Sequence, residues 1–371
     1  MAVDSLPQCE KFEPVSPTKE VHDFVSLRTV DLATYDDGPA ARQKIAQDIH
    51  EAMTTQGFFY LVNHGLSEEQ ISRQVDIGHH ILKNTPEEEK QALRAPMVEE
   101  GSYHGFKPRG HWRTAGNVRD KVENFNISRD MTRREQPKVM TPFKPEIQNF
   151  IDYTHKEILF KILHLFGIAL KLDDEMLFVK MHSYEGHDET WLRYMKYYDD
   201  YTEEEKKSTG GLWMIGHQDF TSLSILFSQP MASLQVRDYQ STEWKFVKHI
   251  PGAIIVNAGE TMMWWTGNYF KAAIHRVFQP PQDQRGRERC SVFYFCVPND
   301  EVVINTLLEQ SPVLRDAGVE MAHELDKAPT SKEWSNGRIA ITGRNAVWDK
   351  KGEDQNVTEE KVGSVTTRWF R

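Results

Sequence analysis

The sequence contains few cysteines and no long apolar run. Cys9, Cys290 and Cys296 are the only cysteines among its 371 residues, and the last two flank the strand-like run SVFYF. Residues six apart on a strand lie roughly 20 Å apart, which is too far for a disulfide. No segment approaches the roughly 20 apolar residues of a membrane span, and the opening MAVDSLPQCEKFEP lacks the apolar region of a signal peptide. We therefore expect reduced thiols, no membrane partner and a cytoplasmic protein.

Positive charge is also in deficit. The chain has 45 Lys and Arg against 55 Asp and Glu, which gives a formal net charge of −10. A surface that binds a polyanion needs an excess of Lys and Arg, so we expect no nucleic-acid partner. With 39% hydrophobic and 27% charged residues, the composition is that of a globular protein with enough apolar residues for a large core.

The first half of the chain predicts a mixture of helices and strands. Between about residues 23 and 145, VSLRTVDL and FFYLVNHG are typical of strands, and PAARQKIAQDIHEAMTTQG is typical of a helix. A second helix is expected over residues 67–83, with Ser67 and Gln70 forming a capping box. Apolar residues at helical spacing predict a core helix over 145–170.

The second half has the pattern of an antiparallel β structure. From about residue 191 to 298, short apolar or aromatic runs such as SLSILFS, AIIVNAG and CSVFYFCVP alternate with turns. Many short strands at regular spacing are typical of a sandwich or barrel. Residues 299–371 are polar and mixed, and a helix is expected over 314–325.

The stretch GHQDF, residues 216–220, places two potential metal ligands close together. Residues i and i+2 of a strand share a face, so His217 and Asp219 project together if this segment is extended. His275 in AAIHRVF offers a third ligand. Two imidazoles and one carboxylate leave three open positions on an octahedral iron(II). Five other histidines compete for such a role: His79, His80, His182, His187 and His249.

Arg289 and Ser291 follow at the start of an apolar run. On one strand face, the guanidinium can bind a carboxylate in a bidentate way while the hydroxyl donates a further hydrogen bond. In an acidic chain an inward-facing Arg favours a bound anion, although Arg289 alone could equally be a charge on an edge strand.

Together these residues resemble the iron(II)- and 2-oxoglutarate-dependent dioxygenases. The order HxD (His217, Asp219), His275 and Arg289-x-Ser291 is similar to that family, and more narrowly to its isopenicillin N synthase-like branch of plant and fungal natural-product oxygenases. TTQGFFYLVNHGLSEEQI and PGAIIVNAGETMMWWTGNYFKAAIHRV also resemble that branch, with Glu260 where the family usually has Asp. The resemblance covers about residues 23–300.

The resemblance implies a mainly β fold with flanking helices. Its core would be a double-stranded β-helix, or jelly roll, over about 191–298, wrapped by the N-terminal region of about 23–145 and the C-terminal segment of about 299–371 in a single domain, 1–371. It further implies iron(II) on His217, Asp219 and His275, with 2-oxoglutarate and O2 as co-substrates and ascorbate as a supporting reductant. A small organic substrate would be hydroxylated, desaturated or rearranged, with release of succinate and CO2.

The segment LRYMKYYDD departs from the family pattern R-x-N-x-Y-P. Tyr197 falls on the tyrosine position and is expected to bind 2-oxoglutarate together with Arg289 and Ser291, but Met195 replaces the Asn. Substrate contacts are expected from four residues near the site: Arg193, Tyr194, Phe220 and Phe106.

Other functions remain open at this point. A relative of the same fold could oxidise its substrate with dioxygen and without 2-oxoglutarate, or could bind a ligand without catalysis. A zinc hydrolase would need a water-activating base near the three ligands, and no such base is evident. The C-terminal segment could cover the active site or form a homodimer.

Overall fold

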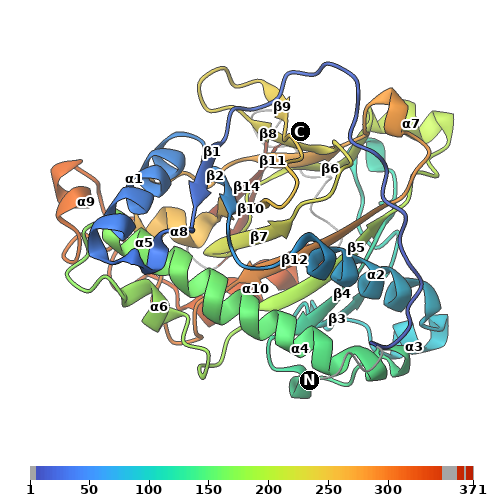
Figure 1. The fold of residues 1–371 in the computed structure, drawn as a ribbon, viewed down its shortest axis with the longest axis horizontal. Coiled ribbons are helices and arrows are strands. Elements are labelled where there is room, and N and C mark those ends of the chain that lie inside the picture. Colours follow the sequence, from blue (N-terminus) through green and yellow to red (C-terminus); the bar gives the residue numbers. More distant parts are fainter. Residues whose placement is uncertain (1–5, 345–356, 363–364, 371) are drawn as a thin grey trace.

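Two β-sheets face each other in the computed structural model, which describes residues 6–344, 357–362 and 365–370 (Figure 1). The larger sheet has the strand order β1-β2-β10-β7-β12-β5-β4-β3 and the smaller one β13-β14-β6-β11-β8-β9. The larger sheet contains β1 (Arg28–Asp31), β2 (Phe58–Val62), β3 (Gly105–Lys107), β4 (Val122–Ser128), β5 (Trp191–Tyr197), β7 (Leu223–Phe227), β10 (Ile254–Ala258) and β12 (Arg289–Cys296). The smaller sheet contains β6 (Leu212–His217), β8 (Leu234–Arg237), β9 (Trp244–Phe246), β11 (His275–Phe278), β13 (Val357–Val362) and β14 (Val365–Phe370).

Helices cover the outer face of the larger sheet. Four pack there or on one another: α1 (Pro39–Thr55), α2 (Glu68–Asn84), α4 (Lys144–Tyr153) and α5 (Phe160–Ala169). A π-helical turn over Thr154–Leu159 joins α4 to α5, and Figure 1 shows the two as one long green helix running below the strands. The other α-helices are α3 (Glu87–Ala92), α6 (Leu177–Met181), α7 (Glu203–Thr209), α8 (Glu260–Trp265), α9 (Pro312–Asp316) and α10 (Ser331–Gly343). Among the described residues, no helix is long and apolar enough to cross a membrane.

The larger sheet has two faces of different character, because side chains alternate along each strand. On β5, Leu192 and Tyr194 belong to the apolar core under the helices. Trp191, Arg193 and Met195 instead line a cavity between the two sheets. The neighbouring strands β7, β10 and β12 alternate in the same way. The apolar core therefore lies on one side of the sheet and the cavity on the other.

The predicted fold class is confirmed, since the chain is mainly β with flanking helices and its sheets form an open jelly roll rather than a closed barrel. The helices expected over 39–57, 67–83 and 145–170 are present, and the capping box of Ser67 and Gln70 forms. All three cysteines are free thiols.

The helix expected over 314–325 is wrong in extent. Gly318 adopts a positive φ of 66°, and its N–H donates to the carbonyl of Arg315. This conformation ends α9 at Asp316. The main C-terminal helix is α10, which begins later, at Ser331, behind a capping box of Thr330 and Glu333. Two short helices, α7 and α8, also interrupt the region over 191–298 that was expected to hold strands alone.

Two buried histidines connect the helices to the sheet beneath the cavity. His155 Nε2 donates to the carbonyl of His182 at 2.9 Å, and its Nδ1 lies 2.8 Å from Tyr294 Oη. His182 Nε2 lies 2.7 Å from Ser222 Oγ, in the loop that leads from Asp219 to β7. Burial lowers the pKa of His155 to about 3 and that of His182 to about 4.

These histidines predict a loss of stability in mild acid. A histidine whose pKa is lowered by folding stays neutral in the native state, but the same histidine in the unfolded chain is protonated below about pH 6.5. The free energy of unfolding therefore decreases as the pH falls from about 6.5 towards 4. Each group adds up to about 1.4 kcal/mol per pH unit to this slope. Denaturant unfolding between pH 7 and pH 5 gives the pH dependence of the free energy of unfolding. In His155→Gln this dependence should correspond to the uptake of about one proton fewer on unfolding. An unaltered slope in His155→Gln would contradict this interpretation.

Candidate functional site

Two histidines lie side by side because strands β6 and β11 pair in an antiparallel way. His217 ends β6 and His275 begins β11, and the two residues are direct partners in the register. Their ring centroids are 4.4 Å apart. The chain between them forms strands and loops that leave this edge and return to it, so the pairing is a property of the fold and not of the local sequence.

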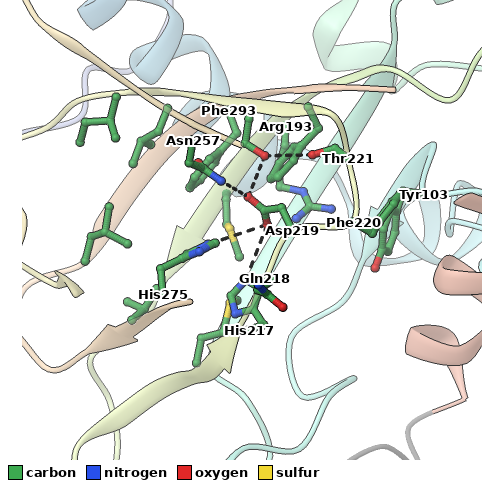
Figure 2. A pocket seen from close by; sticks show the side chains of 18 of the residues that line it. Tyr103, Arg193, His217, Gln218, Asp219, Phe220, Thr221, Asn257, His275 and Phe293 are labelled. Carbon is green, nitrogen blue, oxygen red and sulfur yellow. Dashed lines mark hydrogen bonds and ion pairs between the residues drawn. The ribbon is translucent and has the colours of Figure 1, made fainter. Parts of the chain in front are cut away.

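Asp219 completes a cluster of three ligand-type side chains. Its Oδ1 lies 3.8 Å from Nε2 of His217 and 3.8 Å from Nε2 of His275. One ligand atom from each residue falls within 4.8 Å of the others, which is close enough for all three to hold one metal ion. Figure 2 shows the carboxylate between the two imidazoles at the end of the β6 ribbon.

Hydrogen bonds fix the carboxylate of Asp219. Its Oδ2 accepts from Ser224 Oγ at 2.7 Å and from Asn257 Nδ2 at 2.9 Å. These partners come from β7 and β10, the central strands of the larger sheet, while Oδ1 stays directed at the histidines (Figure 2). Neither Ser224 nor Asn257 was predicted as a site residue. The only local sign was a polar residue at an inward position of an otherwise apolar strand.

Backbone carbonyls fix the two imidazoles in the same manner. Nδ1 of His217 lies 3.0 Å from the carbonyl of Ile215, and Nδ1 of His275 lies 3.2 Å from that of Ala273. A carbonyl can only accept, so each Nδ1 carries a proton and each Nε2 is the ring nitrogen directed towards Asp219. This is the tautomer that a metal ligand requires.

The protonation states also suit metal binding. Burial, followed by the nearby His275, lowers the pKa of His217 to about 4, so this ring is neutral near pH 7. Burial by itself would raise the pKa of Asp219, but the two histidines and the hydrogen bonds from Asn257 and Ser224 outweigh it, and the net pKa is lowered. A neutral imidazole and an ionised carboxylate are the ligand forms that bind a divalent cation.

A second group of predicted residues lies deeper in the cavity. Arg289 pairs across the strands with Tyr197, and its guanidinium lies 5.0 Å from the centre of that ring. Arg289 is buried, and its Nε and Nη1 have no hydrogen-bond partner. The hydroxyl of Ser291, two residues further along the same face, has none either. Within the described ranges, no carboxylate lies within ion-pair distance of Arg289.

Such unpartnered donors are costly unless a ligand satisfies them. Leaving a buried polar group without a partner costs roughly 1–3 kcal/mol, and more if the group is charged. Two nitrogens of Arg289 and the hydroxyl of Ser291 are therefore donors that an anion with several oxygen atoms, such as a carboxylate, can satisfy.

The predicted substrate contacts divide into two pairs. Arg193 and Phe220 line the cavity. Tyr194 does not: it points to the helix side, where its Oη donates to Gln74 Oε1 at 2.6 Å. Phe106 stacks on Phe125 in the apolar core with ring centroids 4.4 Å apart. Strand alternation turns both away from the cavity, and this placement corrects the expectation that they contact the substrate.

Several cavity residues escaped the sequence analysis. Tyr103, two residues before β3, lines the cavity in place of Phe106. Arg338 and Thr342 reach the cavity from α10, far along the chain from His217. Trp334 anchors that helix by donating from its indole nitrogen to the carbonyl of Phe220 at 2.9 Å. No local pattern marks these residues, because only the packing of α10 brings them here.

A jelly roll that holds two histidines, one carboxylate and a buried unpaired arginine has the site of a non-haem metal oxygenase. Residues 27–146 match the family model described as non-haem dioxygenase in morphine synthesis, N-terminal. Residues 189–298 match that of the 2OG-Fe(II) oxygenase superfamily. The chain belongs to this superfamily, as the sequence predicted, and is a 2-oxoglutarate- and iron(II)-dependent oxygenase of this broad type.

Relatives and solved structures agree with this assignment. The 2-oxoglutarate-dependent dioxygenase frbH of Dothideomycetidae sp. (strain 11243) is 27% identical over 208 residues, which are 55% of this chain and 62% of that protein. The 2-oxoglutarate-Fe(II) type oxidoreductase hxnY of Emericella nidulans is 27% identical over 284 residues, which are 72% of this chain and 78% of that protein. A full-length Neurospora crassa protein, crystallised in complex with alpha-KG and thymine, shares the fold with a TM-score of 0.72 at 20% identity, covering 85% of this chain and 97% of that one.

The hydrogen bonds to Asp219 predict an effect on metal affinity. Asn257→Ala and Ser224→Ala each remove one donor from Oδ2, so the carboxylate loses its fixed orientation, and we expect metal affinity to fall about 10- to 100-fold. Anaerobic calorimetric titration with Mn(II) or Fe(II) measures this. Asn84→Ala, at the exposed end of α2, should bind the metal as the unaltered protein does. Wild-type affinity in both cavity variants would refute this role.

Proposed function

We propose that this chain holds iron(II) on His217, Asp219 and His275 and binds 2-oxoglutarate beside it to oxidise a small organic molecule. The observation that carries the proposal is one cavity that contains both the three-ligand cluster and the unpartnered Arg289. The proposed catalytic unit includes both sheets and their flanking helices as a single domain, since β1–β4 pair into the same sheet as the strands around the cavity.

When bound, iron(II) with 2-oxoglutarate and dioxygen would supply the oxidation of an unactivated carbon, with 2-oxoglutarate converted to succinate and CO2. Asp219 and the two histidines occupy one side of the metal position, because all three project from the same end of β6 and β11. The opposite side, towards the cavity, stays available for co-substrate and substrate.

Arg289, Ser291 and Tyr197 orient the co-substrate in this proposal. The guanidinium and the hydroxyl bind the carboxylate far from the metal, in a space where Leu226, Ile255 and Phe293 limit the access of water. A charge-assisted hydrogen bond is stronger there than in water. Met195 offers no hydrogen bond to a carboxylate, and this distinguishes the chain from the R-x-N-x-Y-P pattern.

The substrate is proposed to be a small organic molecule, with natural-product metabolism as its setting. Part of the cavity wall is aromatic, with Tyr103, Trp112, Trp191 and Phe220 among its residues. The Neurospora crassa complex, which contains alpha-KG and thymine together, supports a small planar substrate beside the co-substrate.

The direct test is formation of the ternary complex and turnover of the co-substrate. Anaerobic addition of iron(II) and then 2-oxoglutarate should give a visible metal-to-ligand charge-transfer band, and admission of air should yield labelled succinate from labelled 2-oxoglutarate. His217→Ala should show neither signal, because one of three metal ligands is lost. Absence of both signals in the unaltered protein would refute the proposal. The band without succinate from any substrate would favour a ligand-binding relative.

Removing the anion-binding donors should weaken 2-oxoglutarate binding and leave the metal in place. In Arg289→Gln the charge-assisted contacts are lost, so the dissociation constant of 2-oxoglutarate should rise by about 10- to 100-fold, as expected from the roughly 1.5–3 kcal/mol of a hydrogen bond to a charged group. Ser291→Ala should show a smaller rise. Titration of the charge-transfer band gives these constants, and Mn(II) affinity should not change.

Arg237→Gln provides the matched control, because Arg237 ends β8 outside the cavity. An Arg289→Gln variant that binds 2-oxoglutarate as tightly as this control would show that the co-substrate carboxylate lies elsewhere.

A further inference from the structure

The cavity contains an imbalance of charge. Among the described residues, its lining includes three guanidinium groups, those of Arg193, Arg289 and Arg338, but a single carboxylate, that of Asp219. Arg338 has its own counterion, since its Nη2 lies 3.4 Å from Glu260 Oε2 and both side chains are 3% exposed. Two positive groups, the buried Arg193 and Arg289, and one negative group, Asp219, therefore remain in the cavity.

Arg193 is held in place by a neutral partner. Its Nε donates to Asn126 Oδ1 at 2.6 Å. The amide nitrogen of Asn126 donates in turn to the carbonyl of Tyr103 at 2.9 Å and to Asn124 Oδ1 at 3.0 Å, which fixes the orientation of the amide. Nη2 of Arg193 is buried and has no hydrogen-bond partner. The guanidinium is thus oriented by Asn126 but not neutralised.

Figure 2 shows where this guanidinium lies. It extends from β5 to the side of Asp219 that faces away from His275, towards Phe220 and Tyr103. In the protein without ligands, Asp219 is the carboxylate of the cavity whose charge acts on Arg193. Under the proposed function that carboxylate becomes a metal ligand, so its charge is no longer available to Arg193.

Nearly parallel aromatic rings border the same position. The guanidinium carbon of Arg193 lies 4.7 Å from the ring centre of Phe295 and 5.5 Å from that of Trp191. Trp191 stacks on Phe295 at an interplanar angle of 18° and on Phe220 at 26°. These rings stack on one another and together give this part of the cavity an aromatic wall against which an apolar substrate can pack.

The charges balance only if the substrate is an anion. This step rests on the proposed function. Iron(II) and the dianion of 2-oxoglutarate add no net charge together, so the loaded cavity keeps one positive charge in excess. Arg289 is engaged by the co-substrate and Arg338 by Glu260, which leaves the excess on Arg193. A buried unpaired charge is unfavourable, and a counterion that arrives with the substrate removes the penalty.

We propose that Arg193, oriented by Asn126, binds the carboxylate of a flat, largely apolar monoanionic substrate. One free guanidinium nitrogen and one excess charge suit a single carboxylate, whereas a phosphate monoester carries nearly two charges at neutral pH. The aromatic wall packs against the body of the substrate and Arg193 binds its acid group. These two contacts together determine which carbon of the substrate faces the metal position.

The test compares acids with their uncharged amides of the same shape. The anaerobic complex with iron(II) and 2-oxoglutarate is titrated with three pairs of probes, benzoate and benzamide, cinnamate and cinnamamide, and naphthoate and naphthamide. Binding is followed by tryptophan fluorescence, since Trp191 and Trp112 line the cavity. At least one acid should bind ten or more times as tightly as its amide.

Three variants separate charge from shape. Arg193→Gln should abolish the preference for the acid, and Arg193→Lys should retain part of it. Asn126→Asp places a carboxylate against the same guanidinium and should also abolish the preference, although Arg193 is still present. Arg237→Gln, the same change of charge outside the cavity, should behave as the unaltered protein does.

Equal binding of acids and amides in the unaltered protein would overturn the proposal, and so would a preference that persists in Arg193→Gln. An acid that displaces 2-oxoglutarate from Arg289, seen as loss of the charge-transfer band, would also overturn it. Failure of the proposed function looks different, because then no charge-transfer band forms before any probe is added.

Discussion

The antiparallel pairing of β6 with β11 is the constraint on which the site depends. It sets His217 directly opposite His275, and the chain direction after β6 then carries Asp219 back over both rings. A shift of the register by one residue would turn one imidazole to the other face of the sheet and destroy the cluster. The smaller sheet therefore supplies the two imidazoles and leads directly into Asp219, whereas the larger sheet supplies the hydrogen bonds from Ser224 and Asn257 that hold the carboxylate.

The two faces of the larger sheet divide stability from function. Its helix side is packed with apolar side chains such as Leu192, Ile225 and Val292, all of them fully or almost fully buried. Its cavity side keeps buried polar groups that lack partners, including atoms of Arg193 and Arg289. The apolar face offsets the cost of these groups.

The sequence was most informative where short-range periodicity decides the outcome. RxS places Arg289 and Ser291 on one strand face by a period of two. The extended segment expected for HxD ends at His217, and Asp219 lies in the loop after β6, but the fold still brings His217, Asp219 and His275 together. The same period assigns Tyr194 to the helix side. Tyr194 and its neighbour Arg193 were both expected to contact the substrate, although alternation along LRYMKYY places them on opposite faces of the strand. Local conformation explains the misplaced C-terminal helix, since Gly318 ends α9 through its positive φ. Asn126 and Arg338 could not be predicted, because strand pairing and the docking of α10 alone bring them to the cavity.

The most direct test of the central claim is a crystal structure of the anaerobic complex with iron(II) and 2-oxoglutarate. The account predicts the metal within roughly 2.0–2.2 Å of Nε2 of His217, Nε2 of His275 and Oδ1 of Asp219, as expected for first-row metals with nitrogen and oxygen ligands. It also predicts the distal carboxylate of 2-oxoglutarate on Arg289 and Ser291, with Arg193 still free to bind a substrate. A metal bound elsewhere, or a distal carboxylate on Arg193 with Arg289 unoccupied, would contradict the account.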